Sequence, residues 1–237
     1  MKTIYHADQS RGLAEHGWLT SRHTFSFASY FDPERVNFGL LRVLNDDSVK
    51  PSMGFGTHPH ENMEIVSIPL SGSLRHQDNM GNRHIISAGE VQIMSAGSGI
   101  THSEYNNSSS EEVNFLQIWV LPKENNITPR YDQKRFDENE RKNRFQLLVS
   151  PQNSDKTVRI NQDAWFSLAD IQAGRKIVYE KKGKDHGVYF FLLEGNATID
   201  GHAVYRRDGL GLTAGNTHVV AARNSTQVLA IEVPLAY

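Results

Sequence analysis

Short β-like runs separated by turns fill this chain, and no other feature limits its fold as strongly. Between residues 51 and 120 such runs recur about every 8–12 residues, and none keeps a helical period over about 11 residues. Residues 145–237 repeat this texture, and the turns Glu194-Gly195-Asn196 and Ala214-Gly215-Asn216 echo turns of the first half. Regularly spaced short strands are typical of barrels and sandwiches. We therefore predict an all-β chain whose second half is a diverged copy of its first.

The composition excludes several classes of function. The 237 residues are 38% hydrophobic and 22% charged, as expected for a soluble globular protein. A formal net charge of −2 offers no basic surface for nucleic acid, and the absence of cysteine excludes disulfides and thiolate metal sites. Residues 1–8 lack the apolar core of a secretory signal, and the longest apolar run, Val188 to Leu193, is too short to span a bilayer. We expect a cytoplasmic monomer with no membrane or nucleic-acid partner.

Local patterns predict two strands in the first half. Residues 23–31 are rich in phenylalanine, tyrosine and threonine, which predicts a strand with Phe25 and Phe27 on one face. Leu40 to Leu44 forms a second strand, and the polar run Asn45-Asp46-Asp47 is expected to end it.

Two pairs of side chains able to bind a metal stand out. His58 and His60 are two residues apart, and so are His102 and Glu104 about forty residues later. Successive side chains of a strand point to opposite faces, so each pair shares one face of its strand. Two such strands facing each other would converge three imidazoles and one carboxylate on a single point. This pattern predicts a mononuclear metal site with nitrogen and oxygen ligands.

The residues around the two pairs strengthen this interpretation. They are Gly54, Gly56, Glu64 and Gly72 around the first pair, and Gly89, Gly97 and Asn106 around the second. Their order resembles the two sequence motifs of the cupin family. The chain departs from the cupin pattern at Ser95, where a proline is usual, and the glycines within residues 95–99 are expected to make that turn instead.

Longer segments narrow the resemblance to one family within the cupins. In chain order they are His23 to Phe27, Tyr30 to Pro33, Arg42 to Asp47, Gly54 to His60, Gln77 to Asn82 and Leu116 to Val120. They are similar to segments of the pirin family, whose members are bicupins with two β-barrels in one chain. The resemblance implies tandem cupin barrels with few short helices. One would span residues 1–132 with the metal site, and the other residues 133–237 without metal. A short helix is expected within Asp132 to Asn143.

The pirin resemblance also implies a ligand set and an activity. In that family the N-terminal barrel holds the metal through the two pairs, here His58, His60, His102 and Glu104, and does not use the position of Glu64. The implied activity is quercetin 2,3-dioxygenase, which opens a flavonol ring with O₂ and releases carbon monoxide. The resemblance favours iron(II), while histidine and carboxylate ligands leave nickel, cobalt, manganese, copper and zinc open. Glu104 would be the catalytic base that takes the proton of the flavonol 3-hydroxyl.

A flat aromatic substrate needs an apolar pocket beside the metal. The candidates for its wall are Phe55, Gln117, Phe25 and Trp119, followed by Phe27 and Phe115. An ordinary place in the barrel core is equally open for each of the aromatic candidates. His16 and His23 are weaker candidates, because single histidines are more often exposed or hydrogen-bonded. In the second half His186, His202 and His218 are isolated, which predicts no second metal site.

A second interpretation fits the same ligands. Some pirins act as transcription cofactors, so the centre could be a metal- or redox-state sensor that regulates a protein partner, with flavonol turnover incidental. The two interpretations predict different surroundings for the metal. Catalysis requires a deep apolar cavity for a bicyclic ligand, whereas a sensor requires only a closed metal beneath a flat surface patch.

Overall fold

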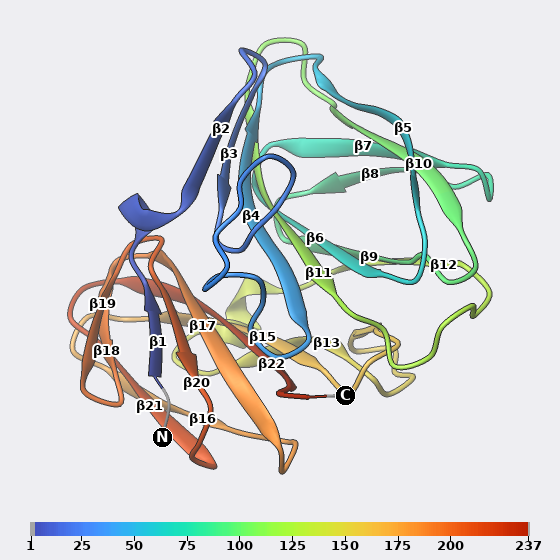
Figure 1. The fold of residues 1–237 in the computed structure, drawn as a ribbon. Helices are drawn as coiled ribbons and strands as arrows, with labels where there is room; N and C mark the ends of the chain where they lie inside the picture. Colours follow the sequence, from blue (N-terminus) through green and yellow to red (C-terminus); the bar gives the residue numbers. More distant parts are fainter. Residues whose placement is uncertain (1–2, 237) are drawn as a thin grey trace.

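The computed structural model describes residues 3–236, which form two β-barrels, one above the other in Figure 1. Each barrel combines a seven-stranded sheet with a four-stranded sheet. The upper barrel contains most of the first half of the chain, and the lower barrel contains the second half together with the first described strand. The predicted all-β fold with two barrels is confirmed.

The N-terminal barrel has sheet orders β12-β9-β6-β11-β4-β3-β2 and β5-β10-β7-β8. Its strands are β2 (Gly12–Glu15), β3 (Leu19–His23), β4 (Leu41–Val49), β5 (Gly54–His60), β6 (Glu64–Ser71), β7 (Ser73–Asp78), β8 (Arg83–Ser87), β9 (Glu90–Ser95), β10 (Ile100–Asn106), β11 (Val113–Val120) and β12 (Arg130–Arg135).

The C-terminal barrel has sheet orders β1-β20-β17-β22-β15-β13-β14 and β16-β21-β18-β19. Its strands are β1 (Thr3–His6), β13 (Gln146–Ser150), β14 (Val158–Arg159), β15 (Trp165–Ile171), β16 (Lys176–Glu180), β17 (His186–Glu194), β18 (Asn196–Ile199), β19 (His202–Tyr205), β20 (Gly209–Leu212), β21 (Thr217–Ala222) and β22 (Thr226–Pro234). Two 3-10 helices complete the described chain, η1 (Asp8–Ser10) and η2 (Glu138–Arg141). Within residues 3–236, no helix has both the length and the apolar character needed to cross a membrane.

The division between the barrels differs from the predicted boundary at residues 132 and 133. Strand β1 pairs with β20, so the first described strand of the chain belongs to the C-terminal barrel. Strand β12 pairs with β9 along its whole length and crosses the predicted boundary without leaving the N-terminal barrel. The helix η2 lies just beyond it, within the stretch where a short helix was expected.

Two predicted strands have other limits in the structure. Strand β3 ends at His23, and the following residues form turns, with Ala28 at a φ of 49°. Phe25 and Phe27 therefore do not share a strand face. Strand β4, by contrast, continues through Asn45-Asp46-Asp47 to Val49, because β3 and β11 pair with it on both sides along this polar run.

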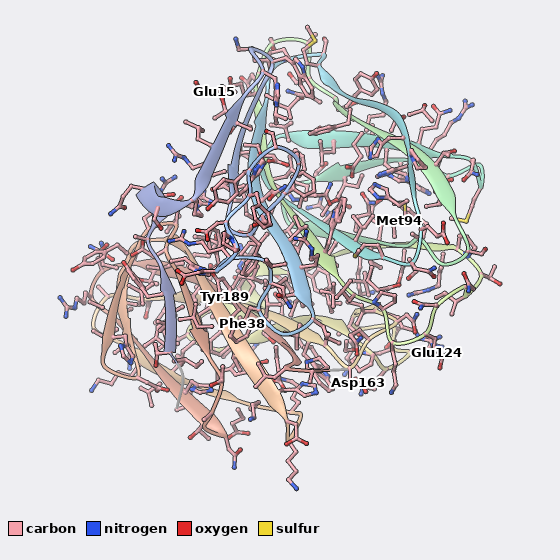
Figure 2. All side chains as sticks on the ribbon, in the orientation of Figure 1. Glu15, Phe38, Met94, Glu124, Asp163 and Tyr189 are labelled. Atoms are coloured by element: carbon pink, nitrogen blue, oxygen red, sulfur yellow. The ribbon has the colours of Figure 1, made fainter. Side chains whose placement is uncertain are left out.

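The largest apolar cluster lies between the barrels, where the two seven-stranded sheets face each other. The N-terminal sheet contributes residues such as Leu44 and Ile118, and the C-terminal sheet contributes residues such as Phe191 and Ile231. Figure 2 labels Phe38 and Tyr189 at this junction, and their ring centroids are 5.4 Å apart. The barrels thus share one core rather than meeting through a polar surface.

The two barrel interiors differ in character. The C-terminal interior is filled by one continuous apolar cluster, which includes Tyr179, Phe190 and Val220. The N-terminal interior contains two smaller clusters, one around Phe115 and one around Met94. Polar side chains occupy the space between these two clusters, and the candidate site lies there.

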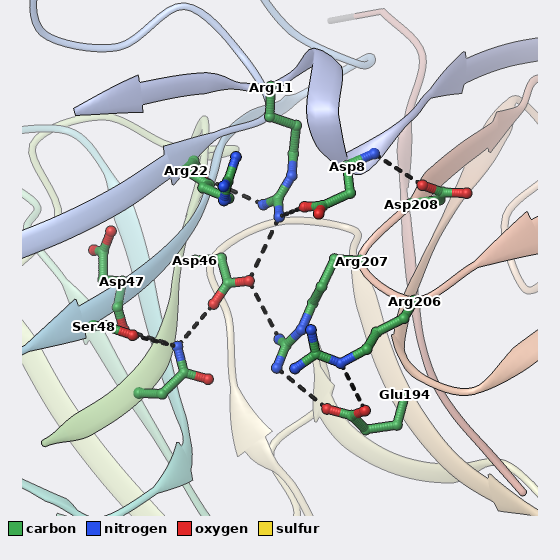
Figure 3. Close-up of polar contacts among 11 residues, drawn as sticks. Asp8, Arg11, Arg22, Asp46, Asp47, Ser48, Glu194, Arg206, Arg207 and Asp208 are labelled. Atoms are coloured by element: carbon green, nitrogen blue, oxygen red, sulfur yellow. Dashed lines mark hydrogen bonds and ion pairs between the residues drawn. The ribbon is translucent and has the colours of Figure 1, made fainter. Parts of the chain in front are cut away.

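A network of ion pairs also joins the barrels (Figure 3). The Asp46 carboxylate lies 3.6 Å from the Arg11 guanidinium and 3.4 Å from that of Arg207. Arg207 is also 3.5 Å from Glu194 of the C-terminal barrel. In Figure 3 the side chain of Asp46 points toward these arginines and that of Asp47 points away from them. This alternation directs Asp47 into the N-terminal barrel.

Candidate metal centre

Strands β5 and β10 place the two predicted ligand pairs opposite each other. They pair antiparallel, with His58 opposite His102 and His60 opposite Ile100. Directly opposed residues project from the same face, so the imidazoles meet inside the barrel. A bulge between His102 and Glu104 shifts the register and sets Glu104 opposite Phe55.

The imidazoles converge closely. One ring nitrogen from each of His58, His60 and His102 lies within 4.8 Å of the other two. A second group, His102, Glu104 and His76, meets the same limit. Ligand atoms around one ion at about 2 Å are roughly 3–4 Å apart, so both groups have nearly the spacing of a coordination shell. His102 belongs to both, so the two groups adjoin at this residue.

The hydrogen bonds of the histidines leave nitrogen lone pairs for a metal. The Nδ1–H of His58 donates to the carbonyl of Gly56 at 2.8 Å, so the neutral ring keeps its lone pair on Nε2. The Nε2 of His102 is buried and has no hydrogen-bond partner among the described residues, while its Nδ1 is 3.5 Å from Nδ1 of His76. An orphaned imidazole nitrogen at the meeting point of three rings fits a metal ligand.

Electrostatics keep the rings of His60 and His102 neutral. Burial, followed by the neighbouring imidazoles His102 and His58, lowers the pKa of His60 to about 4. Burial and the proximity of His58 and His76 lower the pKa of His102 to about 3. Neutral imidazole is the form that binds a metal, so no proton has to leave these two rings near neutral pH.

Glu104 is fixed by two side chains from neighbouring strands. Its Oε2 accepts a hydrogen bond from Nε2 of Gln117 at 2.8 Å, and its Oε1 accepts one from Oγ of Ser67 at 3.2 Å. The carboxylate is 1% exposed. Hydrogen bonds of this kind orient metal ligands and set their basicity. The structure therefore places Gln117, expected to contact substrate, against a predicted ligand.

His76 is a site residue that the sequence analysis missed. It lies on β7 directly opposite Glu104, and its Nε2 is 3.2 Å from Oδ2 of Asp78. Burial acts to raise the pKa of Asp78, but hydrogen bonds from Asn82 and His76 outweigh it and lower that pKa overall. The ionised carboxylate can thus orient the His76 ring. The signal was present, since His76 and Asp78 have the same two-residue spacing as the recognised pairs.

Glu64 points away from the site. Ile65 belongs to the inner cluster of the barrel, so strand alternation turns Glu64 toward the junction between the barrels. There its Oε2 accepts hydrogen bonds from Oγ of Ser95 at 2.8 Å and from the backbone N–H of Asn161 at 3.0 Å. Burial raises the pKa of this carboxyl to about 6. Glu64 therefore supports the junction and is not placed to bind the metal.

The turn before the second ligand pair forms without proline, as expected. Gly97 and Gly99 have φ values of 50° and 130°, in the left-handed region that favours glycine. The carbonyl of Gly97 accepts a hydrogen bond from the backbone N–H of Asn62 at 2.9 Å. This bond ties the turn to the chain that immediately follows His60.

A cavity of about 330 Å³ adjoins the candidate ligands His58, His60 and Glu104. Its volume is at the lower end of the range for small-molecule sites, roughly 300–1,000 Å³. Six of the predicted pocket residues line it: His16, His23, Phe27, Phe55, Gln117 and Trp119. Other lining residues, which the sequence analysis did not single out, include Trp18, Ser21, Asn45 and Asp47.

Two predicted pocket residues lie elsewhere, which corrects the expectation for them. Phe25 is buried in the core between the barrels, with its ring 5.6 Å from that of Tyr189. The turn after β3 sends it to the side opposite Phe27. Phe115 packs in an inner cluster of the N-terminal barrel with Leu74.

The isolated histidines of the second half do not converge. The Nδ1 of His218 is 2.7 Å from Asp200, that of His186 is 3.3 Å from Glu232, and the side chain of His202 is exposed. Among residues 3–236, no group of three candidate ligands is found in the C-terminal barrel. An apolar cluster that includes Tyr179 and Phe190 packs in this barrel, where the buried Glu232 carboxylate accepts a hydrogen bond from the Tyr179 hydroxyl at 2.9 Å.

Two barrels in one chain, with a histidine and carboxylate cluster inside the first, define a bicupin. A sequence model of the pirin family matches residues 6–120, and a model of the quercetinase C-terminal cupin domain matches residues 147–233. A quercetin 2,3-dioxygenase of Escherichia coli (strain K12) is 45% identical over 228 residues, which cover 94% of this chain and 95% of that protein. The chain belongs to the pirin family.

Further relatives agree with this assignment. A pirin-like protein of Caulobacter vibrioides is 39% identical over 222 residues, which cover 93% of this chain and 95% of that protein. The crystal structure of the bacterial pirin YhhW from Escherichia coli in complex with nickel(II) matches with a TM-score of 0.92 and 41% identity, covering 98% of this chain and 99% of that chain. A divalent metal is consistent with the cluster described above.

Proposed function

We propose that this chain is a metal-dependent dioxygenase of the pirin type that opens a flavonol, with quercetin as the model substrate, using O₂. One observation carries the proposal: a cavity with aromatic walls adjoins His58, His60 and Glu104. The name of the relative from Escherichia coli, a quercetin 2,3-dioxygenase, supports the substrate class.

The metal would be held by His58, His60, His102 and Glu104. We propose iron(II), although the donor set also suits nickel, cobalt, manganese, copper or zinc. When bound, the ion would supply Lewis acidity toward the flavonol oxygens and a route for electrons to O₂. The neutral imidazoles of His60 and His102 and the hydrogen-bonded Glu104 carboxylate would serve as ligands with little rearrangement.

The side chains of the cavity have separate tasks in this proposal. Glu104 lines the cavity, and one of its oxygens would take the proton of the flavonol 3-hydroxyl. Gln117 and Ser67 would hold the carboxylate in place during that transfer. The rings of Phe55 and Trp119 would lie along the flat substrate and exclude water from the reacting atoms.

Oxygen uptake after adding quercetin to protein loaded with iron(II) tests the proposal. We expect uptake together with a ring-opened product, and its loss in the His58→Ala variant along with most of the bound metal. His84→Gln is a matched control, because His84 is an exposed histidine that stacks on Tyr131. If metal-filled protein takes up no oxygen with iron, manganese, cobalt, nickel or copper, the dioxygenase proposal fails.

The alternative function, a metal- or redox-state sensor for a protein partner, shares these ligands. It predicts a closed metal beneath a flat patch, whereas the structure has a cavity beside the ligands. This feature favours the dioxygenase. The sensor becomes the better account only if the uptake experiment fails with metal bound.

A further inference from the structure

A row of polar side chains crosses the interior face of the N-terminal barrel. Residues directly opposite each other in antiparallel strands project from the same face of a sheet. Successive register partners form the row: His23, Asn45, Gln117, Ser67 and Gln92. The row therefore runs from β3 through β4, β11 and β6 to β9. It is an unusual feature in a barrel interior, where apolar packing is the norm.

The two parts of this row have different surroundings. The part near the ligands holds the Glu104 carboxylate, as described above. The outer part, His23 and Asn45, lines the cavity, as Gln117 also does. Asp47 follows Asn45 by two residues on β4, projects from the same face and also lines the cavity. We call His23, Asn45 and Asp47 the polar wall.

The polar wall has hydrogen-bonding capacity that the protein does not use. The Nδ1 of His23, the Oδ1 of Asn45 and the Oδ1 of Asp47 have no hydrogen-bond partner among the described residues. These three residues are only 2%, 2% and 3% exposed. A buried polar atom left unpaired is destabilising, so such atoms are expected to find a partner. The cavity is the space from which a partner can come.

The wall offers donors and acceptors without a fixed positive charge. Burial, followed by the positive charge of Arg11, lowers the pKa of His23 to about 4, so its imidazole is neutral near pH 7. Burial raises the pKa of Asp47 to about 7, against a hydrogen bond from Ser21, so a large share of this carboxyl is protonated near neutral pH. Neutral hydroxyl groups match such a surface better than anions do.

Aromatic rings connect the wall to the metal ligands. The ring of His60 is 4.9 Å from that of Trp119, which is 5.3 Å from Phe27, which in turn is 5.2 Å from His23. A flat molecule lying along Trp119 and Phe27 would have one end at the metal and the other at the polar wall.

We propose that the polar wall recognises phenolic hydroxyl groups on the part of the substrate remote from the metal and so determines specificity among flavonols. The inference rests on the proposed dioxygenase function for its substrate class. A site built to hydrogen-bond a hydroxyl discriminates strongly against an analogue that lacks it, because its polar atoms are then left unpaired. The polar wall would therefore favour flavonols with hydroxyl groups on their outer rings over flavonols that lack them.

Binding of quercetin and of 3-hydroxyflavone tests this inference. The second compound keeps the oxygens of the central ring and lacks the hydroxyls of the outer rings. Affinities are measured by calorimetry without oxygen on protein loaded with iron(II). We expect the wild-type protein to bind quercetin at least about 10-fold more tightly. Asn45→Leu and Asp47→Leu should each reduce that ratio to about 3 or less, while Asp47→Asn, which keeps a hydrogen-bonding group, should retain most of it.

Phe27→Leu is the control, because it removes ring contact but none of the hydrogen-bonding groups of the polar wall, and it should weaken binding of both compounds alike. The inference would be overturned if the ratio of affinities for quercetin and 3-hydroxyflavone is unchanged in the Asn45 and Asp47 variants, or if the wild-type protein does not prefer quercetin. The polar wall would then hydrogen-bond only to water. Should Asp47→Leu not fold, Asn45→Leu and His23→Phe carry the test. Selective binding without oxygen uptake would contradict only the dioxygenase proposal. Oxygen uptake without selective binding would contradict only the proposal that the polar wall determines specificity.

Discussion

At the residue scale, Glu104 combines two roles that can be separated. It is a predicted ligand and the predicted base, held by Gln117 and Ser67. Glu104→Gln keeps the size and one acceptor oxygen but removes the negative charge. We expect the three histidines to retain part of the metal, while turnover falls roughly 10²–10⁴-fold because the proton acceptor is lost. Metal analysis and oxygen uptake on one sample check this, with the exposed Glu61→Gln as control. Undiminished turnover would exclude Glu104 as the base.

We expect His76 to act on the site through His102 rather than by contact with substrate. Its Nδ1 faces Nδ1 of His102, and Asp78 orients it from the other side. Removal of such an outer partner weakens metal binding, so His76→Gln is expected to lower metal affinity by about 10–100-fold. Competition with a coloured chelator measures this, and His84→Gln should leave the affinity unchanged. Equal affinities for the two variants would mean that His76 does not position a ligand.

At the scale of elements, β6 serves the site with one face and the junction with the other. Ser67 reaches Glu104 on the inner face, while Glu64 is buried on the outer face. Burial raises the pKa of Glu64 from its ordinary 4.5 to about 6, so folding favours the protonated carboxyl. Its contribution to stability is full below about pH 4.5 and is lost as the pH rises through about 6.

The Glu64→Gln variant removes this titration. A pKa change of this size corresponds to roughly 2 kcal/mol. Relative to the wild-type protein, the variant should therefore gain roughly 1–2 kcal/mol of unfolding free energy between about pH 4 and about pH 7.5. Urea unfolding of both proteins at the two pH values measures the difference, in which all other titrations cancel. If the difference in unfolding free energy between the two proteins does not change with pH, the pKa of the buried Glu64 carboxyl is not raised.

Strand periodicity explains which parts of the site can be predicted from sequence. The two-residue spacing is sufficient to group His58 with His60 and His102 with Glu104, because alternation fixes which side chains of one strand share a face. The pairing of β5 with β10, which brings the two pairs together, is not visible in that spacing. Alternation fails for Phe25, since β3 ends before it and a turn redirects the chain. Local sequence also does not predict that β4 continues through Asn45. The strands that stabilise this part of β4, β3 and β11, cannot be identified from the residues next to Asn45.

At the scale of the whole molecule, the shared core makes the barrels interdependent. The largest apolar cluster draws on both seven-stranded sheets, and β1 crosses from the first half of the chain into the C-terminal barrel. No sequence pattern reveals this crossing, because a four-residue strand carries no signal of its partner. We therefore expect both barrels to unfold in one cooperative transition.

Phe190→Ala tests this cooperativity. Phe190 is buried inside the C-terminal barrel, away from the metal centre. Its truncation should cost roughly 3–5 kcal/mol. If unfolding is cooperative, metal release from the N-terminal barrel should shift to lower temperature together with the main transition. Two separate transitions, with metal release unmoved, would show that the barrels are stable independently.

A crystal of the iron-loaded protein tests whether His58, His60, His102 and Glu104 hold one metal ion. An anomalous difference map at the iron absorption edge shows where the metal lies. We expect a single peak bonded to these four side chains, with His76 outside the coordination shell and no peak in the C-terminal barrel. A peak coordinated by His76 in place of His58 and His60, or one located in the second barrel, would exclude this ligand set.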